Sequence, residues 1–125
     1  MRLLLVLAGG AIGSSARYLV SLWVVDRVGT TFPWSTMSVN IAGSFLIGFI
    51  ATLADELGAI GPDARIFLVV GVLGGFTTFS SFSLETLRLV QANEMPRAFW
   101  NVLASLSLGF AAVLAGVAVG RVLER

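Results

Sequence analysis

Four long apolar runs, separated by short polar connections, dominate this chain of 125 residues. The runs cover residues 3–25, 34–53, 66–90 and 98–119. A helix needs about 20 mostly apolar residues to cross the hydrocarbon core of a bilayer, and each run has that length. Only 12% of the residues are charged, which is too few for a water-facing surface. The sequence therefore predicts an all-α membrane protein, with four transmembrane helices that form a single domain over residues 1–125.

The residue types that are missing limit the chemistry of the chain. It has no cysteine, histidine or lysine, which excludes thiolate chemistry, histidine acid–base catalysis and the usual zinc or haem ligands. The eight basic and seven acidic residues nearly balance, and they form no basic patch for nucleic acid. We therefore expect a protein that is not an enzyme, does not bind nucleic acid and has the lipid bilayer as its surroundings.

The arginines are divided almost evenly between the two ends of the predicted bundle. With an even number of spans, the termini and the second connection share one side, which holds four arginines against three on the other. The positive-inside rule therefore fixes no orientation. Either the count is uninformative in so small a chain, or both orientations insert, which would permit an antiparallel dimer.

The third apolar run is interrupted in its middle, at residues 74–83, by glycine, threonine and serine. Paired glycines and β-branched threonines are poor helix formers, and hydroxyl side chains compete for backbone hydrogen bonds. The pattern predicts a helix that breaks near the middle of the membrane. Non-helical backbone at that depth is tolerated where it is buried in protein or lines a cavity, and such breaks recur at ion sites. A kink without function is the alternative.

A polar stripe follows the second run, because Thr36, Asn40 and Ser44 stand four residues apart on one helix face. An amide in hydrocarbon must find partners or face a polar cavity. Asn40 alone is equally compatible with a hydrogen bond between helices. The stripe, taken together with the broken third run, favours a path for a solute.

Two aromatic residues and an acid follow the break at three-residue spacing, namely Phe79, Phe82 and Glu85. Aromatic ring edges are positively polarised and can contact an anion that has lost its water. Glu85 is either a buried hydrogen-bond acceptor or a group close to the solute path. Arg17, inside the first run, would either extend to the membrane surface or pair with Glu85.

Small residues recur at helical spacing in the first, second and fourth runs. Gly9 and Gly13 are one example, and Gly43 and Gly48 are another. Small residues let helix backbones approach closely in lipid. They predict a compact bundle that associates with further copies.

Residues 9–13 and 16–18, 33–36 and 39–45, and 74–82 together carry a family resemblance. In their order and spacing these segments resemble the fluoride ion channels of the Fluc or CrcB family. The resemblance implies an antiparallel (dual-topology) homodimer with two narrow fluoride pores and a central structural sodium ion. It also implies passive fluoride export, which gives fluoride resistance, by a multi-pass protein of the plasma membrane, expected to be a bacterial inner membrane. The even arginine count then favours insertion in both orientations.

The resemblance also implies roles for particular residues. Asn40 would donate its amide to fluoride, and Phe79 and Phe82 would present ring edges to it. The backbone carbonyls of Gly74 and Thr77 would bind the sodium ion. Other matched positions would lie along or beside the pores, or support them, and these are Thr36, Ser81, Glu85, Ser105 and Arg17.

The sequence departs from the family at Asn101, where the family usually has a tyrosine. This difference would alter the polar lining beside the fourth helix.

Two other functions fit four short spans. A small multidrug-resistance type proton-coupled exporter needs a carboxylate in its first span, but this chain has Arg17 and no acid there. A structural subunit of a larger membrane complex would not need a hydroxyl-rich break. A path that binds fluoride through neutral donors, weakly enough to release it, agrees better with these residues.

Overall fold

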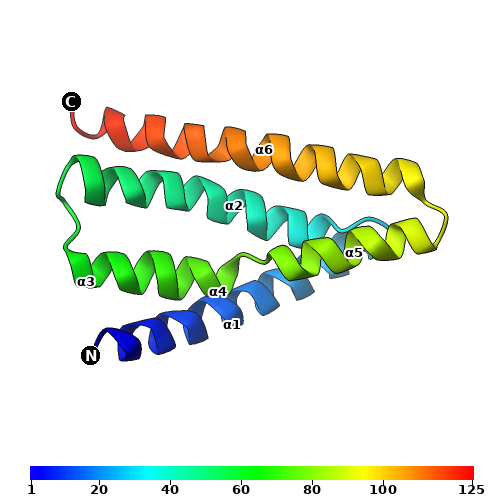
Figure 1. Cartoon of the computed structure of the whole chain (residues 1–125), viewed down its shortest axis with the longest axis horizontal. Coiled ribbons are helices and arrows are strands. Elements are labelled where there is room, and N and C mark those ends of the chain that lie inside the picture. Colours follow the sequence, from blue (N-terminus) through cyan, green and yellow to red (C-terminus); the bar gives the residue numbers. More distant parts are fainter.

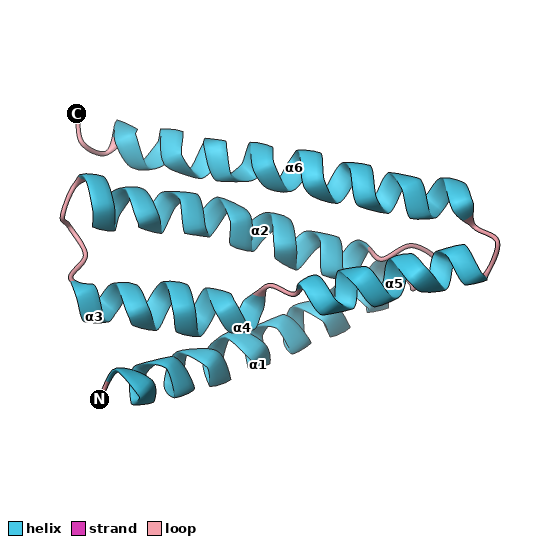
Figure 2. Cartoon of the chain, in the orientation of Figure 1, coloured by secondary structure: helices cyan, strands magenta, loops and turns pink.

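A computed structural model describes all 125 residues and contains only helices (Figures 1 and 2). Four helical segments are long and apolar enough to cross a membrane, as the sequence predicts. Each extends a few residues beyond its apolar run, because the helices continue into polar residues at their ends. The segments are Arg2–Val28, Trp34–Glu56, Pro62–Gln91 and Met95–Val122.

The first and fourth spans are single helices, α1 (Arg2–Val28) and α6 (Met95–Val122). The second consists of α2 (Trp34–Ala51), which continues through the wider π-helical turns of η1 (Thr52–Glu56). The third span is assembled from four pieces. These are α3 (Pro62–Arg65), η2 (Ile66–Leu73), α4 (Gly74–Phe76) and α5 (Phe79–Gln91).

At the end that carries the termini, the spans lie in the order α6, α2, third span and α1 (Figure 1). Toward the other end, α1 passes behind α5 and contacts α2. The closest packing joins α2 to α6 and α1 to η2. Both chain termini and the connection between η1 and α3 lie at the same end of the molecule. An even number of crossings produces this arrangement.

Glycines bring the helix backbones together at two of these seams. A Cβ atom on Gly13 would collide with the backbone carbonyl of Val72 in η2, and one on Gly116 would collide with that of Phe45 in α2. Gly10 differs, because a Cβ there would meet nothing within 4 Å. The predicted close packing is therefore confirmed at the four glycines named from the sequence, Gly9, Gly13, Gly43 and Gly48.

The predicted break in the third span is confirmed. The chain is extended at Thr77 (φ −86°, ψ 158°) and Thr78 (φ −151°, ψ 117°), so α4 ends at Phe76 and α5 begins at Phe79. Figure 2 shows this short non-helical segment in the middle of the span. The two half-helices diverge slightly, and α5 continues to the opposite end of the molecule.

Ion pairs gather at the end that carries both termini. All are solvent-exposed, and exposed pairs add little stability, so they orient the helix ends more than they hold the bundle together. The pairs are Arg2–Asp63 (3.3 Å), Arg65–Asp55 (3.0 Å) and Arg121–Glu56 (2.8 Å).

Candidate functional site: two cavities along the broken helix

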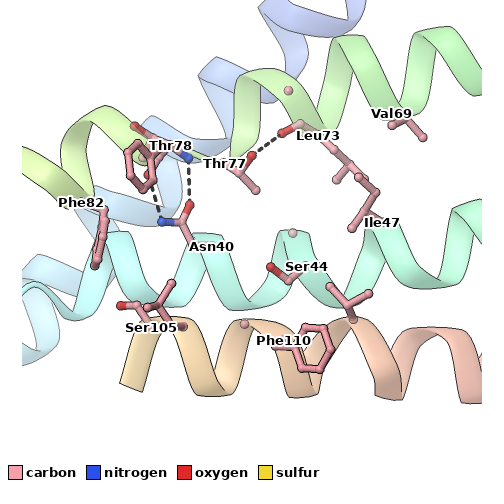
Figure 3. Close-up of a pocket in the computed structure, with 16 residues that line it drawn as sticks. Asn40, Ser44, Ile47, Val69, Leu73, Thr77, Thr78, Phe82, Ser105 and Phe110 are labelled. Carbon is pink, nitrogen blue, oxygen red and sulfur yellow. Dashed lines mark hydrogen bonds between the residues drawn. The ribbon is translucent and has the colours of Figure 1, made fainter. Parts of the chain in front are cut away.

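A cavity of about 530 Å³ lies beside the break, between α2, the third span and α6 (Figure 3). It brings together residues from three spans that the sequence analysis selected separately. None of its lining residues is charged. The predicted site residues among them are Asn40, Gly74, Thr77, Phe79, Phe82 and Ser105.

Asn40 clamps the extended segment of the break. Its Nδ2 donates to the Thr78 carbonyl at 2.9 Å, and its Oδ1 accepts from the Thr78 N–H at 2.8 Å (Figure 3). In a continuous helix, the Thr78 N–H would donate to Gly74. Asn40 therefore replaces the backbone partners that the break removes, and this meets the requirement that buried amides be satisfied. One Nδ2 hydrogen remains, because an amide nitrogen carries two.

Thr78 also begins α5. Its side-chain Oγ1 accepts from the Ser81 N–H at 3.1 Å, which is the N-cap arrangement that threonine favours. Ser81 thus contributes its backbone to the cap. Its predicted place in a fluoride path remains a prediction.

Close packing on both sides supports the break. A Cβ on Gly43 in α2 would collide with the methyl group of Thr77, and a Cβ on Gly75 would lie 2.7 Å from the Gly10 carbonyl in α1. The Thr77 hydroxyl donates to the Leu73 carbonyl at 2.9 Å. α2 therefore packs against the extended segment itself, and α1 packs against Gly75, two residues before it.

The two phenylalanines predicted for the site do face the same cavity. The ring centroids of Phe79 and Phe82 are 5.7 Å apart with an interplanar angle of 43°. Phe79 is 77% exposed, so much of its ring extends beyond the cavity. A ring that is exposed on a membrane-spanning helix leaves apolar surface for a neighbouring helix or lipid.

A second cavity, of about 310 Å³, lies nearer the end of the molecule that carries the first connection, and Glu85 and Arg88 line it. Glu85 therefore lines a different cavity from Phe82, although the two are three residues apart on α5. Its Oε1 accepts from Thr36 Oγ1 at 2.8 Å, while Oε2 is buried without a partner. Because Thr36 and Asn40 belong to one α2 stripe, the stripe runs from the second cavity toward the first.

On the α6 side, Ser105 and Asn101 form a polar cluster with Thr86 of α5. Asn101 is 1% exposed, and its Nδ2 donates to Thr86 Oγ1 at 2.9 Å. Ser105 Oγ donates to Asn101 Oδ1 at 3.4 Å. Ser105 lines the first cavity, whereas Asn101 does not.

Arg17 does not pair with Glu85. The ion pairs within 4.0 Å involve other residues, and Glu85 bonds to Thr36 instead. Arg17 is half-buried on α1. Of the two alternatives, the structure excludes the pairing.

Sequence reasoning missed two participants, the Thr78 backbone as the partner of Asn40 and Thr86 as the partner of Asn101. For the first, the sequence carried a signal only for Thr78 as a helix start, since threonine is a favoured N-cap residue, and none for its bonds to Asn40. The second carried none, because Thr86 and Asn101 belong to different spans whose rotation the sequence does not fix.

Four apolar spans, with one interrupted at mid-length beside an uncharged polar cavity, define a multi-pass membrane protein of the discontinuous-helix kind. The chain belongs to the CrcB family: the family model described as "CrcB-like protein, Camphor Resistance (CrcB)" matches residues 4–117. This confirms the resemblance and the plasma-membrane location.

Named relatives cover nearly the whole chain. A protein of Rhizobium meliloti is 48% identical over 95% of both chains. One of Agrobacterium fabrum is 50% identical over 94% of both, and one of Thermus thermophilus is 51% identical over 95% of this chain and 93% of its own. All three carry the name "Fluoride-specific ion channel FluC". An ion channel is not an enzyme, which agrees with the sequence analysis.

Proposed function

We propose that this protein is a fluoride-selective channel that lets fluoride leave the cell passively. The observation that carries the proposal is the first cavity, which has amide, hydroxyl and aromatic groups on its wall and no charged side chain. Fluoride is small and strongly hydrated, so a path must replace its water with close donors and still release it. A fixed arginine or lysine would hold the ion too tightly. The names of the relatives support fluoride as the ion.

The proposed path follows the α2 stripe. Fluoride would enter the second cavity near Arg88, pass Thr36 and reach the remaining Nδ2 hydrogen of Asn40. From there it would continue through the first cavity, where Phe79 and Phe82 offer ring edges. Ser81 would contribute its hydroxyl near the break, and Ser105 its hydroxyl from α6. Glu85 would border the path and limit how strongly Arg88 holds the ion.

The proposed assembly is an antiparallel homodimer with two such pores. Large apolar side chains are exposed along α1, α5 and α6, and a partner would cover some of them. The division of arginines, four against three, opposes neither orientation. An isologous pair of inverted copies closes with twofold symmetry.

The proposed sodium ion would lie at the twofold axis, bound by the carbonyls of Gly74 and Thr77 from both chains. One observation favours a cation at this position. The Thr78 N–H donates to Asn40 Oδ1, so it does not donate to the Gly74 carbonyl, as it would in a continuous helix. Oxygen ligands without carboxylates suit a monovalent hard cation, and no cluster of three acids or histidines offers a site for a divalent one.

Fluoride efflux from proteoliposomes, measured with an ion-selective electrode beside chloride efflux, tests the function. We expect fluoride flux and negligible chloride flux. Equal flux of both ions, or none, would contradict the proposal.

Asn40→Asp tests the path. The carboxylate loses the donor to the Thr78 carbonyl and adds negative charge to the cavity, so fluoride flux should fall more than about 100-fold, the equivalent of about 3 kcal/mol in the barrier. Ser38→Ala, on the exposed side of the same helix, should conduct normally. Unchanged flux in Asn40→Asp would remove Asn40 from the pore.

Single cysteines test the orientation, because the chain has none of its own. Thr30→Cys lies in the connection between α1 and α2, at one end of the molecule. A membrane-impermeant thiol reagent should label about half of the Thr30→Cys molecules in intact cells and the rest after lysis. Complete labelling, or none, in intact cells would exclude dual topology.

A further inference from the structure

Asn101 is the least expected polar group in the bundle, because it is buried on α6 and touches neither cavity. Its amide links Thr86 on α5 to Ser105, one turn further along α6. Its hydrogen bond to Thr86 joins α6 to α5, the half-helix after the break.

The bond from the Thr86 hydroxyl to the Phe82 carbonyl decides which atoms donate and which accept in the rest of this cluster. The Phe82 carbonyl can only accept, and Thr86 Oγ1 donates its single proton to it at 2.8 Å. Thr86 can then only accept from Asn101, so Asn101 must present Nδ2 toward α5. The amide oxygen Oδ1 therefore faces Ser105, whose hydroxyl must be the donor.

The last bond in the cluster is the weak one. The Ser105 Oγ to Asn101 Oδ1 distance is 3.4 Å, compared with about 2.7–2.8 Å for a typical O–H···O bond. The Ser105 hydroxyl thus has a partner when the cavity is empty of anions, but one that it can leave at little cost. A donor of this kind suits a path that must both bind and release an ion.

We propose that Asn101 is a positioning residue that holds the Ser105 hydroxyl in readiness for an anion in the first cavity. The proposal rests on the proposed function, and it assigns to Asn101 an action through Ser105 and no contact with the ion. The amide keeps the hydroxyl away from the α6 backbone, since a serine in a helix otherwise donates to the carbonyl four residues earlier.

Replacement of the amide should release Ser105 to that carbonyl. In Asn101→Leu, we expect fluoride efflux to fall about fivefold, the equivalent in rate of one hydrogen bond, with chloride flux still negligible. Thr86→Val keeps Asn101 but removes the acceptor that orients it, and it should produce a similar fall. Thr86→Val also carries the test if Asn101→Leu does not fold. Ser107→Ala, an exposed serine on the same helix, is the matched control and should conduct normally.

A double-variant cycle separates positioning from simple packing. Ser105→Ala should itself lower the flux about fivefold, and Asn101→Leu should then lower it no further, because the group through which Asn101 acts is gone. If the two losses multiply to about 25-fold, Asn101 only ties α5 to α6 and the inference is wrong. Normal flux in both Asn101→Leu and Thr86→Val would also overturn it. A wild-type protein that conducts no fluoride would instead contradict the proposed function, and the inference with it.

Discussion

The two halves of the third span are held in place by different forces. Before the break, η2 packs on α1 through glycines, with backbone against backbone and no side-chain hydrogen bond between the two. After the break, side chains hold α5: Glu85 bonds to Thr36 on α2, and Thr86 bonds to Asn101 on α6. Glu85 and Thr86 are adjacent, so their side chains point about 100° apart around the helix and reach different neighbours.

The difference between the halves shows how one helix can serve both rigidity and permeability. Close glycine packing excludes water and ions, because no space remains between the backbones. Polar side chains keep the backbones further apart and leave cavities lined with donors. The second cavity lies beside α5, and the first spans the break, from Val69 in η2 to Phe82 in α5. The proposed path therefore runs along α5 and past the break.

Gly13→Ala should have the largest effect and tests the packed half. The added Cβ would collide with the Val72 carbonyl, which is backbone and cannot move aside. We expect a loss of more than about 3 kcal/mol and little folded protein. Size-exclusion chromatography after detergent extraction measures the folded yield. Gly10→Ala, where a Cβ meets open space, is the control. Equal yields of the two variants would show that α1 and η2 do not pack closely at Gly13.

Thr36→Val should come next and tests the polar half. It leaves both Glu85 oxygens without a partner, at a cost of about 2 kcal/mol in unfolding free energy. Thr52→Val is the matched control: Thr52 is also buried on the second span, but its hydroxyl bonds only to the Gly48 carbonyl of its own turn. Thermal unfolding in detergent compares the two. Equal losses of unfolding free energy in the two variants would mean that the Thr36–Glu85 hydrogen bond does not stabilise the protein.

Thr78→Val should have a smaller effect, about 1 kcal/mol, because it removes the α5 N-cap and leaves the backbone bonds to Asn40 intact. The neighbouring Thr77→Val loses only a bond to the Leu73 carbonyl and should be closer to wild type. The same unfolding measurement distinguishes them. A larger loss of stability in Thr77→Val than in Thr78→Val would show that the Thr78 side chain is not what stabilises the start of α5.

Arg121→Gln should have the smallest effect. The Arg121–Glu56 pair has good geometry at 2.8 Å, but both groups face solvent, where ion pairs contribute little. We expect an unfolding midpoint indistinguishable from wild type in moderate salt. A clear drop would show that the polar ends, and not only the glycine seams, hold the helices together.

The sequence determined the number of spans and the location of the break. Four runs of sufficient length can only be helices in a bilayer, since all backbone groups must be satisfied within each span. The break falls at Thr77 and Thr78, within the predicted weak stretch, where β-branched and hydroxyl side chains disfavour a helix, whereas the paired glycines Gly74 and Gly75 remain helical in α4. Composition alone also excluded thiolate and histidine chemistry. These conclusions rest on properties of neighbouring residues, which a sequence displays directly.

Only the tertiary structure decided which side chains meet. Asn40 could have faced fluoride, another helix or lipid, and its two bonds to Thr78 follow from how α2 is rotated against the break. Glu85 and Phe82 are three residues apart on α5, yet they line different cavities, because different neighbouring helices surround them. Helix rotation and crossing depend on the fit of whole surfaces, through glycines that allow contact and cavities that prevent it. That fit involves residues far apart in the chain, so no local pattern encodes it.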